Sequence, residues 1–262
     1  MAHPRDLEGR ALLAVTAHPD DEAILCGGLV AWIVERGATV HLLCLTRGEH
    51  GQGEGDVGQR RRDELLAATT VLGITSTTLL THEDGMLAWL DPAILDRDIT
   101  AVIDGKQPEV IVTFDQDGAY GHPDHITVHE RTTTAVRQLG EHAPALFYAT
   151  IAPGSMRTLV DHVAATYPSR KSAPTPPSTV LGVDNPDAWG AAALNPTLII
   201  DAQAYGLRKL AALACHHSQF HNSALAFVAK ADAPRLLGIE YYRRATVGGR
   251  GRAFIEHLGN VV

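Results

Sequence analysis

The chain has 262 residues, of which 45% are hydrophobic and 20% are charged, and its formal net charge at pH 7 is -8. This composition is typical of a globular protein with a sizeable core, and the acidic balance argues against nucleic acid or an anionic membrane surface as the main partner. No linker divides the first 150 residues, so we predict a single domain that spans residues 1–262.

The cysteines and the first residues bear on the compartment. Cys26, Cys44 and Cys215 are scattered among apolar neighbours, which is typical of buried thiols in a reducing compartment. The polar N-terminus, residues 1–10, does not resemble a secretory signal, and no apolar run reaches membrane-spanning length. We therefore predict a cytoplasmic protein without a membrane partner, and a homo-oligomer stays open.

The first predicted elements flank a polar turn. The apolar run 11–15 indicates a buried strand, and the longer apolar run 23–34 indicates a packed helix. Between them stands Thr-Ala-His-Pro-Asp-Asp-Glu at 16–22, in which Pro19 suits the first turn of the helix. A strand-to-helix turn of a parallel α/β sheet is where such folds place their ligands.

The chemistry of this turn has two interpretations. His18 and Asp21 are an imidazole and a carboxylate three residues apart, and both can bind one divalent metal such as zinc. Alternatively, Asp20 caps the helix and His18 is a strand-end histidine bonded to the backbone. This turn alone does not decide between them.

The next segments predict a second strand at 40–45, a loop, and a helix at 57–72. The loop, residues 46–55, is glycine-rich and polar, and it lies at the edge of the sheet where substrate-covering loops belong. Within it, Glu49 and His50 are either substrate contacts or solvated loop residues.

Two further strands follow, at 77–81 and 110–114, with a helix from Pro92 to about Asp104 between them. The first of these strands ends in the polar turn His82-Glu83-Asp84-Gly85. An Asp-Gly pair is also an ordinary turn signal, so the role of Asp84 stays open at this point.

A second His-Pro-Asp turn follows the strand at 110–114. The residues Tyr120-Gly121-His122-Pro123-Asp124-His125 open another helical stretch, and capping alone does not require two histidines around a proline. With His125 as a third ligand, the metal would have two histidines and one carboxylate, and a position would remain for water.

The remaining chain predicts a strand at 145–151, a helix at about 202–215 that ends at His216-His217-Ser218-Gln219, and a short strand at 240–244. Between them, a proline-rich stretch around 167–188 indicates a surface excursion. The succession of strands and helices predicts an α/β fold, a Rossmann-like, mostly parallel sheet with helices on both faces.

The two turns carry a family resemblance. Ala-His-Pro-Asp-Asp-Glu at 17–22 and Gly-His-Pro-Asp-His at 121–125 resemble the PIG-L/LmbE-like family of zinc-dependent N-acetylglucosaminyl deacetylases. The resemblance implies that Asp20 is the general base, that Arg61 and Asp84 contact substrate hydroxyls, and that His216 marks the rim of the pocket. Arg61 matches an Arg-x-x-Glu-Leu pattern, although a solvated helix face is the alternative; His216 would otherwise be a surface histidine at a helix end.

The candidate residues of the two turns predict how a base and a metal would act. A divalent metal held by His18, Asp21 and His125 would lower the pKa of a bound water from roughly 16 to about 7 and polarise an amide carbonyl. Asp20 would then take the proton of the water, because neighbouring side chains diverge and Asp20 does not share the metal with Asp21.

The second turn would supply the other groups, in roles that also resemble the family's. His122 would face the carbonyl and, hydrogen-bonded to Asp124, stay protonated, so that it stabilises the oxyanion and then protonates the leaving amine. The hydroxyl of Tyr120 would be a second donor to the oxyanion, and an aromatic side chain packed over the turn is the alternative.

We therefore predict a metal-dependent hydrolase that removes the acetyl group from an N-acetylglucosaminyl-type amino sugar or conjugate. Zinc (Zn²⁺) is the expected cofactor, with Fe²⁺ or another divalent metal as the alternative. An amidase that cleaves a larger acyl amide of a thiol-sugar conjugate and an inactive, metal-containing sugar-binding module are the other functions considered. The presence of Asp20, His122 and Asp124 argues against the inactive module.

Overall fold

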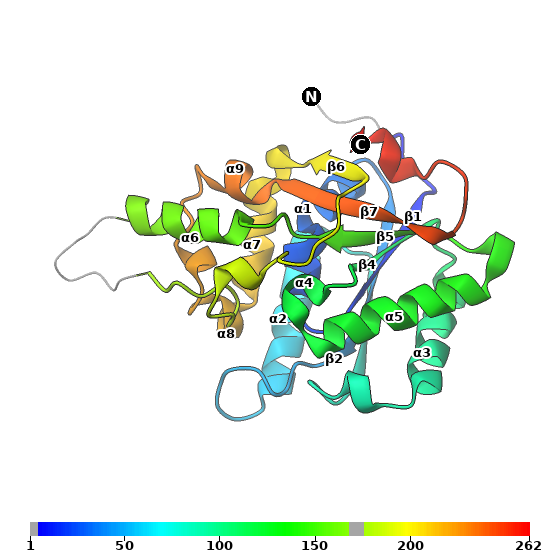
Figure 1. The fold of residues 1–262 in the computed structure, drawn as a ribbon, viewed down its shortest axis with the longest axis horizontal. Helices are drawn as coiled ribbons and strands as arrows, with labels where there is room; N and C mark the ends of the chain where they lie inside the picture. Colours follow the sequence, from blue (N-terminus) through cyan, green and yellow to red (C-terminus); the bar gives the residue numbers. More distant parts are fainter. Residues whose placement is uncertain (1–4, 168–175) are drawn as a thin grey trace.

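Helices pack around one central sheet in the computed structural model, which describes residues 5–167 and 176–262 (Figure 1). In these ranges the strands lie in the order β3-β2-β1-β4-β5-β7-β6-β8. The first five along this edge-to-edge order run parallel, and their bounds are Ser76–His82 for β3, Thr39–Thr46 for β2, Ala11–Thr16 for β1, Val110–Phe114 for β4 and Ala145–Thr150 for β5. Antiparallel pairing then adds β7 (Ile239–Gly248), β6 (Leu198–Asp201) and β8 (Asn260–Val261).

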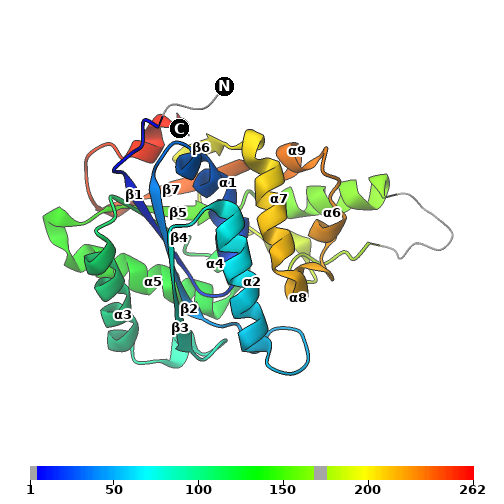
Figure 2. The same cartoon turned by 180° about the vertical axis from the view of Figure 1, so that it is seen from behind.

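The larger helices cover both faces of the sheet. Helices α1 (Asp21–Glu35), α2 (Val57–Leu72) and α7 (Gly206–Cys215) pack together on one face, which Figure 2 shows from behind. On the other face, α3 (Pro92–Lys106) packs against α5 (Pro123–Gln138). Right-handed crossovers require this change of side, because the chain winds from β1 out to β3 and then returns across the sheet to β4. The predicted fold class is confirmed.

The central strands explain why the sequence patterns were readable. Leu12 to Val15 in β1 and Val110 to Phe114 in β4 are buried, since helices cover both faces of these strands. A strand buried on both sides is a continuous apolar run, and this is how both appear in the sequence. The predicted bounds of β1, β2, β3 and β4 differ from the observed ones by one residue or less at each end.

The last third of the chain departs more from the predictions. The sequence pattern gave no element for α6 (Ser155–Thr166) or β6, and the helix predicted from 202 begins as α7 at Gly206 after a short 3-10 turn. The predicted strand at 240–244 is the middle of the longer β7. Residues 168–175 of the predicted proline-rich excursion lie outside the described residues, and the domain bounds 1–262 stay a prediction.

The described residues also form several short helices. The α-helical ones are α4 (Gly118–Gly121), α8 (His217–Phe220) and α9 (Ala233–Leu237). The 3-10 helices are η1 (Leu87–Trp89), η2 (Gly140–His142), η3 (Pro186–Ala188), η4 (Gln203–Tyr205), η5 (Ala224–Phe227) and η6 (Phe254–His257). None of the described helices is both long and apolar enough to cross a membrane.

The topology fixes where a ligand site belongs. The winding of the chain reverses between β1 and β4, which pair in parallel with Leu12 opposite Val110 and Ala14 opposite Val112. In open α/β sheets the crevice at this reversal, outside the carboxyl ends of the strands, binds ligands. Both His-Pro-Asp turns follow these two strands, so the fold brings them to the same crevice.

Candidate metal centre and its cavity

The first turn leads from β1 into α1. The sequence suggested that Pro19 lies in the first turn of the helix. In the structure it lies before the helix, because α1 begins at Asp21 and Asp20 occupies the N-cap position. Asp20 has φ 113, a conformation that residues other than glycine rarely adopt. Within the described first turn of α1, no backbone N–H donates to the Asp20 side chain, so the capping interpretation of Asp20 is wrong. The carboxylate of Asp21 instead accepts the backbone N–H of His18 at 2.7 Å.

The second turn leads from β4 through α4 into α5. Here Pro123 is inside the first helical turn and His122 is the N-cap, whose Nδ1 accepts the backbone N–H of Asp124 at 3.2 Å. One turn further, Nδ1 of His125 lies 3.1 Å from the carbonyl oxygen of Gly118. A carbonyl oxygen can only accept, so Nδ1 of His125 carries the proton and its Nε2 presents a lone pair.

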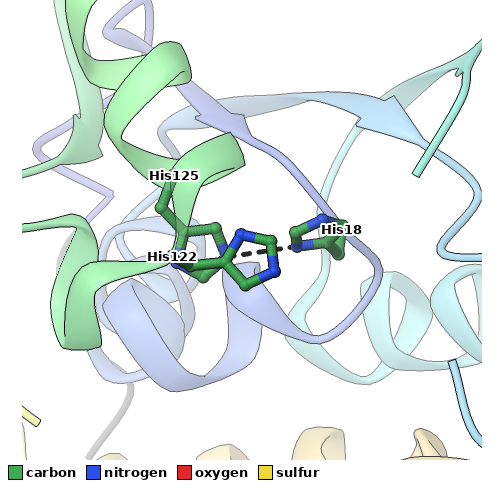
Figure 3. Close-up of side chains that lie close together, drawn as sticks. All are labelled: His18, His122 and His125. Carbon is green, nitrogen blue, oxygen red and sulfur yellow. Dashed lines mark hydrogen bonds between the residues drawn. The ribbon is translucent and has the colours of Figure 1, made fainter. Parts of the chain in front are cut away.

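The three predicted metal ligands converge. Nδ1 of His18 lies 3.1 Å from Nε2 of His125 and 3.6 Å from Oδ2 of Asp21. Nε2 of His125 lies 3.3 Å from Oδ1 of Asp21. All three side chains are buried, and Figure 3 shows the imidazoles of His18 and His125 joined by a dashed line with His122 beside them. His18 and His125 thus contact different oxygens of Asp21. The groups whose ligand atoms all lie within 4.8 Å of one another are His18, His122 and His125, and His18, Asp84 and Asp124.

The donor chemistry of this centre fits zinc. Nε2 of His18 lies 3.2 Å from Oδ2 of Asp124 and 3.0 Å from Oδ1 of Asp84, and because carboxylates accept, this nitrogen carries a proton. When His18 is neutral, the nitrogens of His18 and His125 that face each other both present lone pairs, and a metal ion can bind between them. Two imidazole nitrogens and one carboxylate oxygen form a common catalytic zinc site with one position left open.

The charges around His18 support the same conclusion. Burial lowers the pKa of His18, but the carboxylates of Asp124, Asp84 and Asp21 outweigh burial and raise this pKa to about 10. Burial raises the pKa of Asp21 to about 7. Burial and the neighbouring imidazoles of His18 and His122 lower the pKa of His125 well below its ordinary value. The buried carboxylates thus require a positive charge at this place, which a protonated His18 or a bound metal ion supplies.

The carboxylate of Asp124 faces His18, and among the described residues it makes no hydrogen bond to the side chain of His122. Its carboxylate is fully buried and accepts the backbone N–H groups of Gly85 at 2.8 Å and Leu87 at 3.0 Å, in addition to facing His18. The prediction that Asp124 keeps His122 protonated is therefore wrong. Burial and the neighbouring His18 lower the pKa of His122, so its imidazole is neutral at pH 7.

His122 nevertheless lies beside the centre. One nitrogen each from His18, His122 and His125 lies within 4.8 Å of the others, so His122 is close enough to approach a metal ion. Its Nδ1 is engaged by the N-cap hydrogen bond, which leaves Nε2 as the nitrogen that carries the proton. A neutral His122 is thus a hydrogen-bond donor on the cavity wall.

Asp20 and Asp21 point to different partners, as the sequence predicted. Asp21 contacts the two imidazoles, whereas Oδ2 of Asp20 lies 3.1 Å from Nη2 of Arg61 and its backbone N–H donates to Oε2 of Glu22. Burial raises the pKa of Asp20 and the positive charge of Arg61 lowers it. Asp20 is therefore a carboxylate beside the centre and outside the ligand set.

Arg61, predicted to bind substrate hydroxyls, is largely engaged by the protein itself. Its guanidinium donates to the carbonyl oxygens of Gly48 at 3.0 Å and Pro19 at 2.6 Å, besides contacting Asp20. A Cβ atom at Gly48, whose φ is 64, would lie 2.3 Å from Nη1 of Arg61, so this part of the glycine-rich loop packs directly on the arginine. Arg61 still forms part of the cavity wall.

The other predicted substrate contacts divide into one on the cavity wall and two behind it. Asp84 lines the cavity, and although burial raises its pKa, the hydrogen bond from His18 holds the value at about 2. Glu49 accepts the backbone N–H of Asp84 at 3.1 Å from behind. His216 is only 1% exposed, with Nε2 2.6 Å from Oε1 of Glu22, so both the rim position and the alternative of a surface histidine are wrong.

The cavity above the centre has a volume of about 270 Å³. Tyr120 belongs to its wall, and the Tyr120 ring packs 4.6 Å from the ring of Trp189. Burial and the nearby Asp21 raise the pKa of the Tyr120 hydroxyl, which therefore keeps its proton. The lining residues are His18, Asp20, Asp21, Ile24, His50, Gly51, Arg61, Asp84, Gly85, Tyr120, His122, Leu181, Trp189 and Gln219.

Several wall residues were not predicted. Leu181 and Trp189 come from the polar stretch after α6, where no periodicity indicates a partner. Ile24 looks like an ordinary core residue of α1 in the sequence. Gln219 stands in the His-His-Ser-Gln segment that the family pattern marks, so a closer use of this pattern could have identified it.

The chain has clear relatives among known proteins. Residues 13–136 match the family model PIG-L, described as GlcNAc-PI de-N-acetylase. A protein of Mycobacteroides abscessus named 1D-myo-inositol 2-acetamido-2-deoxy-alpha-D-glucopyranoside deacetylase is 33% identical over 195 residues, which cover 63% of this chain and 69% of the relative. A protein of the same name from Acidothermus cellulolyticus is 31% identical over 268 aligned positions, covering 89% and 88% of the two chains.

A solved structure shows the same fold. The N,N'-diacetylchitobiose deacetylase of Pyrococcus horikoshii superposes with a TM-score of 0.62 and 20% sequence identity, and the match covers 90% of this chain and 84% of that chain. At this level of identity the likeness concerns the arrangement of helices and strands.

Proposed function

The chain belongs to the PIG-L family, and from this premise we propose that it is a deacetylase that hydrolyses the N-acetyl group of an N-acetylglucosaminyl-type amino sugar or conjugate. The observation that carries the proposal is the close contact of the His18 and His125 imidazoles with each other and with the Asp21 carboxylate, beside the separate carboxylate of Asp20. An amide hydrolase needs this combination of a metal site and an adjacent base.

The metal in this proposal is zinc, with Fe²⁺ as the alternative that the same donor set would accept. His18, Asp21 and His125 would hold it, and when bound it would supply Lewis acidity toward the amide carbonyl and acidity to a bound water. Asp124 and Asp84 contribute by fixing the orientation of the His18 ring, as carboxylates behind metal-binding histidines commonly do.

Asp20 acts as the general base. Its carboxylate borders the cavity next to the centre. Burial raises its pKa, and the Arg61 guanidinium opposes this rise. Asp20 takes a proton from the attacking water and, once protonated, it can return this proton to the nitrogen of the leaving amine. This second transfer replaces the one that the sequence had assigned to a protonated His122.

His122 and Tyr120 act as neutral donors. The Nε2–H of His122 and the hydroxyl of Tyr120 both belong to the cavity wall near the centre, and both keep their protons at pH 7. Donors held in a buried site stabilise the negative charge that develops on a carbonyl oxygen during attack.

The sugar would occupy the polar part of the cavity, where Asp84, His50 and Gln219 offer groups for hydroxyl recognition. The relatives suggest a glycoside of N-acetylglucosamine with a polyol as the first compound to test. The cytoplasmic location and the absence of nucleic-acid and membrane partners stay predictions, and so does a homo-oligomer.

The test is an amine-release assay. The protein is stripped with a chelator, reloaded with one equivalent of Zn²⁺ or Fe²⁺, and incubated with N-acetylglucosamine, its inositol glycoside, N,N'-diacetylchitobiose and an analogue with a longer acyl chain. We expect free primary amine and acetate from at least one N-acetyl substrate, and only with metal present. Binding of these sugars without amine release would support the inactive module, and a preference for the longer acyl chain would support the amidase.

A further inference from the structure

The backbone of Asp20 needs support from its surroundings. With φ 113 and ψ -26, Asp20 adopts a conformation that is unfavourable for an L residue with a Cβ atom. Such a conformation persists only when neighbouring groups hold it, because rotation of the peptide to an ordinary helical conformation would swing the carboxylate away from the cavity. Arg61 contacts the side chain of Asp20 and donates to the carbonyl oxygen of Pro19, on one side of the Pro19–Asp20 peptide. The N–H on the other side of this peptide needs an acceptor of its own.

Glu22 supplies this second contact. Its side chain is completely buried, and each of its oxygens has one donor: Oε2 accepts the backbone N–H of Asp20 at 3.1 Å, and Oε1 lies 2.6 Å from Nε2 of His216. A carboxylate only accepts hydrogen bonds, so Nε2 of His216 donates. Glu22 thus joins the strained peptide to a residue that lies 194 positions further along the chain.

His216 stands at a fixed corner. It separates α7 from α8, and its carbonyl oxygen accepts the backbone N–H groups of Gln219 at 3.0 Å and Phe220 at 2.8 Å. Nδ1 of His216 is buried and has no hydrogen-bond partner among the residues that the structure describes. Among the described residues, the buried ring of His216 is therefore held by one side-chain hydrogen bond, from its Nε2 to Glu22.

We propose that Glu22 and His216 are a pair of positioning residues that hold the backbone of Asp20 in its strained conformation and so keep the carboxylate of Asp20 aimed at the attacking water. The proposal rests on the proposed function, in which Asp20 is the general base. Neither residue lines the cavity or contacts the substrate in this role, and the family resemblance had placed His216 at the rim. Their effect reaches the reaction through the Asp20 peptide.

The test compares Glu22→Gln with Glu22→Met, measured as zinc-loaded proteins in the amine-release assay. In Glu22→Gln the amide oxygen still accepts the N–H of Asp20, and His216 can move its proton to the partnerless Nδ1 and accept from the amide. Glu22→Met keeps the length of the side chain and removes the acceptor. Glu64→Gln is the matched control, because Glu64 binds Ser218 in the same segment without reaching Asp20.

We expect Glu22→Met to lower kcat about 10- to 100-fold, the range typical for groups that orient an active-site residue from behind, with KM and zinc content unchanged. Glu22→Gln should stay within about threefold of the parent kcat, and so should Glu64→Gln, because the acceptor for Asp20 is kept in the first and is not involved in the second. If Glu22→Met does not fold, His216→Met and His216→Gln provide the same comparison, since only the glutamine can donate to Glu22.

Three results would overturn the proposal. The parent kcat in Glu22→Met would show that Asp20 needs no such support. Equal losses in Glu22→Gln and Glu22→Met would assign the effect to the charge of Glu22, and loss of zinc would assign it to the ligand Asp21. Asp20→Asn in the same assay separates this failure from that of the proposed function: an active Asp20→Asn refutes Asp20 as the base, whereas an inactive one beside a fully active Glu22→Met refutes the positioning pair alone.

Discussion

The two His-Pro-Asp turns contain the same three residue types but differ in backbone. In the first, the proline precedes the helix, and the proposed ligands His18 and Asp21 stand on either side of a residue with positive φ. In the second, Pro123 is the first residue of the helix, His122 is its N-cap, and the proposed ligand His125 lies in the first helical turn. The shift of the helix start by two residues changes what each position of the motif faces.

The difference divides the chemistry between the turns. The histidine before proline is a proposed metal ligand in the first turn, whereas in the second it caps the helix and lines the cavity. The aspartate after proline is a base candidate beside Arg61 in the first turn, whereas in the second it is buried behind His18. The identity of the residues therefore does not determine the role until the start of the helix is known.

The largest expected effect comes from removing a ligand from either turn. We expect Asp21→Ala and His125→Ala to lose stoichiometric zinc and more than about 1,000-fold of kcat/KM, because the metal ion supplies several kcal/mol of transition-state stabilisation. His129→Gln is the control on the same helix, since His129 bonds to the carbonyl oxygen of Phe114 outside the centre. Metal analysis and the amine-release assay measure both quantities, and full zinc content in either alanine variant would contradict the assignment.

The aspartate after proline gives the next largest effect, and the two turns should differ. We expect Asp20→Asn to keep zinc and to lose about 100- to 1,000-fold in kcat, as is usual when a general base is removed. Asp124→Asn should instead weaken zinc binding about 10- to 100-fold, because Asp124 orients a ligand. Zinc affinity from chelator competition and kcat distinguish the two, and identical behaviour of both variants would remove the distinction between the turns.

The histidine before proline in the second turn should matter for rate and not for metal. His122→Asn keeps an N-cap acceptor and removes the donor from the cavity, so we expect a loss of about 100-fold in kcat with zinc content and melting temperature preserved. A loss of zinc in this variant would show that His122 is a ligand, which its distance from His18 and His125 would allow.

Zinc binding should depend on pH in a direction that the first turn determines. In the metal-free protein the pKa of His18 is raised to about 10, so its proton is present at pH 7 and must leave before Nδ1 can bind zinc. Affinity should therefore rise about tenfold per pH unit between pH 7 and 9 and level off above pH 10. Chelator competition across this range is the measurement, and a flat profile would show that His18 is neutral before zinc binds.

The central strands, the two turns and the three proposed ligands could be predicted from the sequence. Strands buried on both faces appear as unbroken apolar runs, so β1 and β4 and the turns after them were located within a residue or two. The spacing of His18, Asp21 and His125 indicated three ligands, and parallel strands required their turns to meet at one edge.

Other features depend on contacts that no local pattern contains. The carboxylate of Asp124 faces His18 instead of His122, and it is held there by the Gly85 and Leu87 amides, which come from a different part of the chain. The burial of His216 follows from its pairing with Glu22 across α1 and α7. Trp189 reaches the cavity from a segment without periodicity, and its packing on Tyr120 is visible only in three dimensions.

The most direct test of the central claim is the position of the metal in crystals grown with one equivalent of zinc, located by anomalous scattering at the zinc edge. The account predicts one peak about 2.0–2.2 Å from Nδ1 of His18, an oxygen of Asp21 and Nε2 of His125, with Asp20 outside the ligand set. A peak held by Asp84 and Asp124 on the other side of the His18 ring, or a peak without contact to Asp21, would contradict it.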